Sequence, residues 1–170
     1  MKTIYRRRFL LEDLPAPLTR ASEHLQFFDN YLTATRLLLR QIRTPKTKLW
    51  ERKFVQEFPV EAADFSKLNY AEIDLSEYEY EALSVFEGNE LRYNRYFYEL
   101  ETGRLAIDMI LNRELWNLIL ASAEFGTEAE ANAFSSPDFA AREITRDEFF
   151  LPQNLTNSTL EDVKKHLETV

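Results

Sequence analysis

Short runs of β-branched and aromatic residues, often alternating with polar ones, dominate the pattern of hydrophobic positions along the chain. Alternation with a period of two and an excess of Tyr, Phe, Thr and Ile are typical of strands. Glu101–Arg104 indicates the turn of a hairpin between two of these runs. The pattern predicts strands within residues 3–11, 26–41, 46–58, 70–75, 91–100, 105–111 and 115–125.

Capping boxes, in which a Ser or Thr is followed three residues later by Glu, indicate where helices begin. They occur at Ser76–Glu79, Thr127–Glu130 and Ser158–Glu161. Few other segments have helical spacing, so strands outnumber helices. The chain is therefore predicted to be an α+β domain, a closed or nearly closed antiparallel β-barrel with a few short helices.

Composition narrows the class of protein. The 170 residues fit one domain, residues 1–170, and 45% of them are hydrophobic, which allows a real core. A formal net charge of -8 disfavours a general binder of nucleic acid or anionic membranes. The absence of cysteine excludes disulfides and thiolate metal sites, and it suits a reducing cytosol.

Three consecutive arginines, Arg6 to Arg8, stand near the start of this acidic chain. An export signal would need a longer apolar stretch behind them, but Glu12 and Asp13 follow after three apolar residues. No run elsewhere approaches the roughly 20 apolar residues of a membrane span. We therefore expect a cytoplasmic protein with no membrane partner, and the arginines need another interpretation.

Basic residues recur on one face of several predicted strands. They are Arg6 with Arg8, Arg36 with Arg40, Lys48 with Arg52, and Arg95 alone. Since every second residue of a barrel strand points inward, these faces predict a lumen rich in guanidinium groups. Buried arginines need anions, and the forked guanidinium suits phosphate or carboxylate. The alternative is that the same arginines lie on the outer face, among solvent and surface carboxylates.

Five segments, in order, resemble the CYTH superfamily of triphosphate tunnel metalloenzymes. They are "IYRRRFLL", "FFDNYLTATRLLLRQ", "TKLWERKF", "LRYNRYFYE" with "GRLAIDMIL", and "LASAEFGTEAEANAFSSPDFAAREITRDEFFLPQNL". The resemblance implies an eight-stranded antiparallel β-barrel whose tunnel binds a triphosphate on basic residues and a divalent metal on glutamates. Known members hydrolyse inorganic triphosphate or thiamine triphosphate, or convert ATP to cyclic AMP.

The basic positions of the family are largely kept, and the resemblance assigns them to anion binding. They fall on Arg8, Arg36, Arg40, Arg52 and Arg95. Arg6 takes the place of a glutamate in the opening motif and adds a further positive charge.

The acidic positions are largely lost. The resemblance leaves Asp108, Glu124 and Glu143 as candidate metal ligands. The other expected glutamates fall on Ile4, Arg6, Asn69, Ala71, Ala106 and Ser122. Because Mg²⁺ or Mn²⁺ needs several oxygen ligands, we expect a weak metal site or none. The three remaining carboxylates alternatively neutralise the tunnel arginines.

These observations predict a divergent barrel that binds a polyphosphate or another phosphorylated small anion, with its metal-dependent catalysis weakened or lost. One alternative is an active inorganic or thiamine triphosphatase, or an adenylate cyclase, on a rebuilt metal site. A second alternative is a structural or interaction module whose tunnel is filled by side chains.

Overall fold

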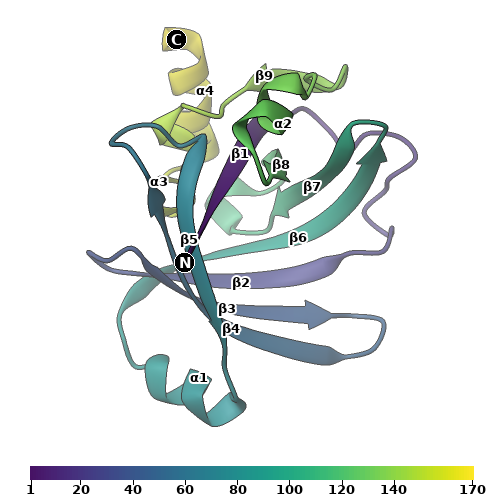
Figure 1. The fold of residues 1–170 in the computed structure, drawn as a ribbon. Helices are drawn as coiled ribbons and strands as arrows, with labels where there is room; N and C mark the ends of the chain where they lie inside the picture. Colours follow the sequence, from purple (N-terminus) through teal and green to yellow (C-terminus); the bar gives the residue numbers. More distant parts are fainter.

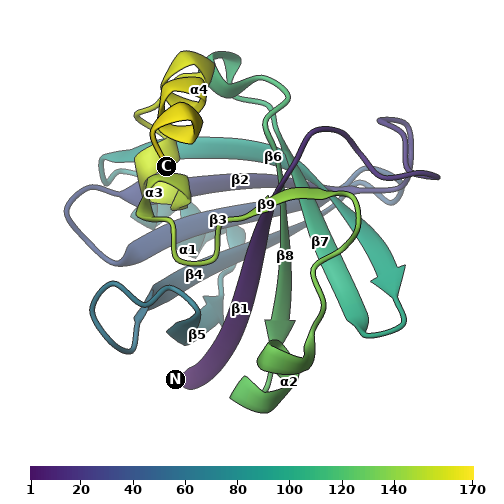
Figure 2. The ribbon, with the colours of Figure 1, turned by 90° about the horizontal axis from the view of Figure 1, so that it is seen from above.

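Eight antiparallel strands close into a barrel in the computed structural model, which describes residues 1–170. They are β1 (Lys2–Leu11), β2 (Leu25–Leu32), β3 (Leu37–Thr44), β4 (Leu49–Pro59), β5 (Lys67–Asp74), β6 (Gly88–Leu100), β7 (Gly103–Ile110) and β8 (Ile119–Phe125). Around the ring the order is β1-β5-β4-β3-β2-β6-β7-β8, and β8 pairs back with β1 (Figures 1 and 2). The predicted barrel is thus confirmed.

Strand β1 changes partner along its length. On one edge it pairs with β8, from Tyr5 to Leu11. On the other edge its first half pairs with β5, and its last residues pair with the short strand β9 (Ala140–Glu143). Between these partners the Arg6 amide donates to the Ser66 carbonyl at 2.9 Å, and the Arg8 amide donates to Thr145 Oγ1 at 3.0 Å. The consecutive arginines therefore stand on a strand that is hydrogen-bonded along both edges.

The run at 26–41 holds a hairpin rather than one strand. Residues between β2 and β3 turn with Ala34 at φ 58°, and Thr35 stabilises the turn. Its hydroxyl donates to the Leu32 carbonyl at 2.8 Å and accepts from the Leu37 amide at 3.1 Å. The turn contains no Gly, Pro, Asn or Asp, so the usual sequence signals were missing.

Four short α-helices and two 3₁₀ turns complete the fold. They are α1 (Glu77–Leu83), α2 (Glu128–Ala133), α3 (Pro152–Leu155), α4 (Leu160–Thr169), η1 (Arg113–Leu115) and η2 (Glu148–Phe150). The first two predicted capping boxes are present. The third was wrong by one residue: Thr159 and Asp162 cap α4, while the Ser158 hydroxyl donates to the Asn154 carbonyl. None of the helices is long and apolar enough to cross a membrane.

The C-terminal segment closes one end of the barrel. Phe150, Leu155 and Val163, from η2, α3 and α4, pack in one apolar cluster with inward-facing residues such as Leu91 and Ile110. Figure 2 shows α3 and α4, coloured yellow, together against this end. A second apolar cluster lies on the outer side of β1, β6, β7 and β8, where Phe134 at the end of α2 covers it. The lumen therefore has an apolar end, which the C-terminal segment from η2 to α4 closes.

Candidate functional site

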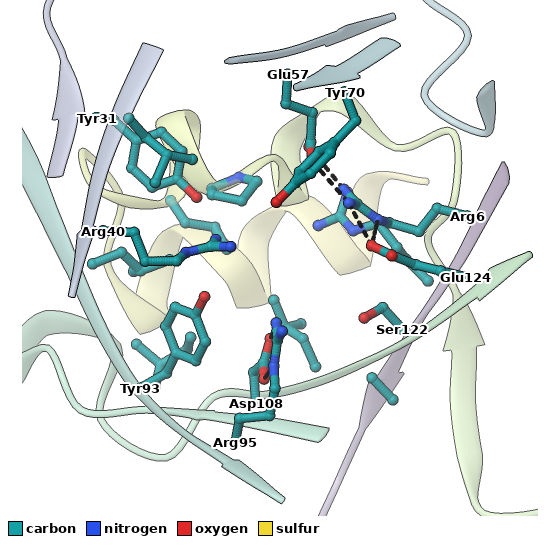
Figure 3. Close-up of a pocket in the computed structure, with 18 of the residues that line it drawn as sticks. Arg6, Tyr31, Arg40, Glu57, Tyr70, Tyr93, Arg95, Asp108, Ser122 and Glu124 are labelled. Atoms are coloured by element: carbon teal, nitrogen blue, oxygen red, sulfur yellow. Dashed lines mark hydrogen bonds and ion pairs between the residues drawn. The ribbon is translucent and has the colours of Figure 1, made fainter. Parts of the chain in front are cut away.

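A cavity of about 300 Å³ lies inside the barrel, and all eight strands and α3 contribute to its wall (Figure 3). Its charged lining consists of five cations and four carboxylates. They are Lys2, Arg6, Arg8, Arg40 and Arg95, and Glu57, Glu72, Asp108 and Glu124. The hydroxyls of Tyr31, Tyr70 and Tyr93 also point into it (Figure 3). The cavity is thus rich in charge, but its positive charge is almost balanced.

Four of the predicted arginines lie in this lumen, namely Arg6, Arg8, Arg40 and Arg95. The intervening Arg7 points outward and binds Glu143 of β9 through two hydrogen bonds of 2.9 and 2.8 Å. The prediction that the arginines of β1, β6 and β3 face the lumen is therefore correct for these four residues.

Two lumen arginines are each held by a carboxylate directly across the neighbouring strand. Arg40 and Arg95 each donate from Nε and Nη2 to both oxygens of a carboxylate, at 2.7 and 2.8 Å. Their partners, Asp29 and Asp108, stand opposite them in the strand register. Such two-point bonds are stronger than neutral hydrogen bonds and fix the direction of the guanidinium.

Arg6 is held by two carboxylates. Glu124, opposite it on β8, accepts from Nη2 at 2.7 Å, and Glu57 on β4 accepts from Nη1 and Nη2 at 2.7 and 2.8 Å (Figure 3). Burial disfavours the charged form, yet the two carboxylates outweigh it and raise the pKa of Arg6. For Glu57 burial opposes the charge of Arg6, and the net result is a lowered pKa. Both groups therefore stay ionised at neutral pH.

Asp29 is fully buried between β2, β3 and β6. Besides Arg40, the Tyr93 hydroxyl donates to it at 2.8 Å. Burial, followed by the charge of Asp29, raises the pKa of both Tyr93 and Tyr31 well above the ordinary value. These tyrosines are therefore neutral hydroxyls at neutral pH and can donate hydrogen bonds inside the lumen.

Arg8 differs from the other arginines of the lumen. The residue opposite it on β8 is Ser122, and no carboxylate lies within ion-pair distance of it. Nη2 donates to the Phe150 carbonyl, while Nη1 is buried without any hydrogen-bond partner. Burial, with repulsion from Arg6, lowers the pKa of Arg8 to about 10, so it remains charged at pH 7. Arg8 is thus a buried cation with free hydrogen-bonding capacity.

Three of the predicted site residues lie elsewhere. Arg36 is exposed before β3 and stacks 3.9 Å above the ring of Phe58. Arg52 points to the outer side of β4, 4.0 Å from Glu77 of α1. Glu143 lies outside the barrel with Arg7, so it cannot join a ligand set in the lumen. The prediction that these three line the tunnel was wrong.

On β4 the residues that face the lumen are Lys53, Val55 and Glu57, whereas the prediction had placed the face of Arg52 inward. Lys53 binds Glu72 and Asp74 at 3.0 and 3.1 Å, and Glu57 lies four positions further along the same face. Sequence reasoning missed Glu57, Glu72 and Asp29. Lys53, Val55 and Glu57 alternate in the sequence, but the other face of this strand also mixes charged and apolar residues. The sequence therefore did not show which face points inward.

The carboxylates of the lumen do not form a metal shell. Asp108 and Glu124 face the cavity, but each is bound to an arginine. No group of three or more His, Cys, Asp or Glu side chains is arranged to hold a metal ion. Since Mg²⁺ and Mn²⁺ need several oxygen ligands free to coordinate, these residues do not fit such an ion.

Comparison with known proteins bears on the fold. No family model matches the sequence, and no curated protein matches it. The crystal structure of the inorganic triphosphatase NE1496 is similar over 93% of this chain and 97% of that one, with a TM-score of 0.59 and 23% identity. A protein from Pyrococcus horikoshii OT3, PH1819, covers 76% of this chain and 82% of its own, with a TM-score of 0.51 and 13% identity. The chain therefore shares the barrel fold of these two structures, which is the fold that the sequence predicted.

Proposed function

We propose that this protein binds a phosphorylated or similar anionic small molecule in the barrel lumen, with Arg8 as the anchor, and that its metal-dependent catalysis is weakened or lost. The observation that carries the proposal is the buried, unpartnered Nη1 of Arg8, a residue that lines the internal cavity. The similarity to an inorganic triphosphatase supports a phosphorylated ligand.

A cation buried without a counter-charge, such as Arg8, destabilises the protein. A charge removed from water without a counter-charge is unfavourable, and so is a buried donor without an acceptor. An anion beside Arg8 would supply both the charge and the acceptor. The neutral hydroxyl of Tyr31 faces the same cavity and can donate to a remaining oxygen of the anion (Figure 3).

The two alternative functions have less support. A filled tunnel would leave no room for a ligand, whereas this lumen keeps a cavity of about 300 Å³. An active metallo-phosphatase would need Asp108 or Glu124 to exchange an arginine for a metal ion. We infer that phosphate release from tripolyphosphate, with Mg²⁺ or Mn²⁺ present, stays at the level of the uncatalysed reaction.

The binding test uses inorganic phosphate in EDTA at constant ionic strength, followed by thermal unfolding. At ten times the Kd, mass action predicts a stabilisation of about 1.4 kcal/mol, or roughly 3–6 °C in Tm. Arg8→Met should abolish this shift. Arg36→Met is the matched control, because Arg36 belongs to the same predicted arginine set but is exposed outside the cavity. An equal shift in the wild type and Arg8→Met would contradict the proposal.

A further inference from the structure

We propose that the ligand carries a single anionic head group on a compact, uncharged and largely apolar body, and that the lumen rejects polyphosphate chains. This inference rests on the proposed function, because it concerns the same cavity and the same anchor. It departs from a triphosphate ligand for three reasons: the balance of charge, the single arginine without a counter-charge and the character of the closed end.

The first reason is that the lumen neutralises itself. Arg40 and Arg95 each bind one carboxylate through Nε and Nη2, and Arg6 is shared between two. The lining has five cations and four carboxylates, and the buried Asp29 bound to Arg40 is a fifth carboxylate, so no positive charge is in excess. A ligand with one negative charge therefore disturbs this balance less than a chain of phosphates does. A chain of phosphates would bring several charges close to Glu57 and Glu124, and like charges repel strongly where water is scarce.

The second reason is that Arg8 is the one arginine of the lumen without a counter-charge. Its Nη1 is buried and has no hydrogen-bond partner. The hydroxyls of Tyr31 and Ser122 point into the same cavity (Figure 3). One phosphate or carboxylate head group at Arg8 would use these donors, whereas a longer chain of phosphates would extend past arginines whose charges are already neutralised.

The third reason is the apolar end beside Arg8. Nη2 of Arg8 donates to the carbonyl of Phe150, in the C-terminal segment that closes the barrel. Arg8 therefore stands at the boundary between the charged ring and the apolar end. The side chains that line the cavity at this end are Leu38, Leu91, Ile110, Leu120 and Leu155. An uncharged body placed among them gains from leaving water, whereas phosphate groups placed there would lose hydration.

The volume limits the body. A cavity of about 300 Å³ is at the small end of the range for ligand pockets, and it matches one ring or a short chain rather than a nucleotide. Phenyl phosphate and benzoate are therefore suitable probes, since they share one ring and differ in the head group. Their relative affinities show whether the head group is phosphate or carboxylate.

The test measures Kd by calorimetry in EDTA at constant ionic strength. We expect phenyl phosphate to bind at least about tenfold more tightly than inorganic phosphate, because its ring is buried at the apolar end. Tripolyphosphate should bind more weakly than phenyl phosphate, and benzyl alcohol, which has no charge, should not bind. Leu120→Asn should remove most of the preference for phenyl phosphate over inorganic phosphate.

Glu124→Gln tests the charge argument by gain of function. Glu124 is 54% exposed, and Glu57 still pairs with Arg6 in this variant, so it should fold. Removing the charge of Glu124, the partner of Arg6 Nε, should tighten tripolyphosphate binding by about tenfold, the value of one charge-assisted hydrogen bond. Glu99→Gln, on the outer surface beside Arg104, is the matched control and should change nothing.

The outcomes separate the two proposals. If neither phenyl phosphate nor benzoate nor any inorganic phosphate binds, the proposed function itself fails. If tripolyphosphate binds the wild type more tightly than phenyl phosphate does, only the single-head-group inference is overturned. The same holds if Glu124→Gln leaves tripolyphosphate binding unchanged, since the carboxylates would then not be what excludes it.

Discussion

The two ends of the lumen hold their arginines in different ways. In the charged ring, Arg40 and Arg95 face a carboxylate directly across the strand register and bind it at two points. Beside the closed end, Arg8 faces Ser122 and meets only the Phe150 carbonyl. The same side chain is therefore a structural ion pair in one place and an available cation in the other. Strand register, rather than the number of arginines, decides which of them can hold a ligand.

Removing an arginine from the ring should produce the largest effect on stability. Arg40→Met leaves Asp29 fully buried without its counter-charge, which should lower the free energy of unfolding by about 3–5 kcal/mol. Urea denaturation followed by circular dichroism measures this change. A loss below about 1 kcal/mol would mean that Asp29 does not depend on its arginine, and the contrast with Arg8 would disappear.

An acid titration of stability should separate Glu57 from surface carboxylates. Its pKa is lower in the folded protein than the ordinary 4.5, so the folded state holds this proton less tightly than the unfolded state does. By linkage, Glu57 stabilises the fold at and above pH 4.5, and this contribution is lost as the pH falls through the folded pKa. We therefore expect Glu57→Gln to be less stable than the wild type at pH 7, with the difference shrinking below pH 4.5.

The measurement for Glu57 is urea unfolding at a series of pH values from neutral to strongly acidic. Glu99→Gln is the control, because its partner Arg104 is also on the outer surface and little burial is involved. A difference between Glu57→Gln and the wild type that is constant with pH would rule out an ionic role for Glu57.

The sequence was sufficient to predict the barrel and part of the lumen lining. The strands differ in how clearly their sequences show which face points inward. On β1 the run of three arginines and three apolar residues does not alternate, and the resemblance to the family's opening motif assigned Arg6 and Arg8 to one face. On β4 each face carries both charged and apolar residues. One face has Trp50, Arg52 and Phe54, and the other has Lys53, Val55 and Glu57. A slip of one residue exchanges the two faces, and no feature of a single strand chooses between them.

The carboxylates of the ring were harder to predict than the arginines. Asp29 and Glu57 acquire their roles from residues on other strands, 11 and 51 positions away from their arginines. That pairing depends on the register of the closed barrel, which one sequence does not give. The resemblance to a metal-binding family directed attention to Asp108, Glu124 and Glu143, whereas the buried partners stood at positions that the family motifs do not include.

The smallest effect on stability is expected at Arg8, and it sharpens the comparison most. Arg8→Met replaces a buried, unpaired cation by an apolar chain of similar length, and it leaves no carboxylate without a partner. The lost bond to the Phe150 carbonyl is offset by the removal of the desolvated charge, so the free energy of unfolding should change by less than about 1 kcal/mol. In the same urea series Arg40→Met should lose several times more. Such a small change would mean that folding does not depend on Arg8 and that its buried charge serves a ligand. A loss at Arg8 equal to that at Arg40 would instead make Arg8 a structural residue.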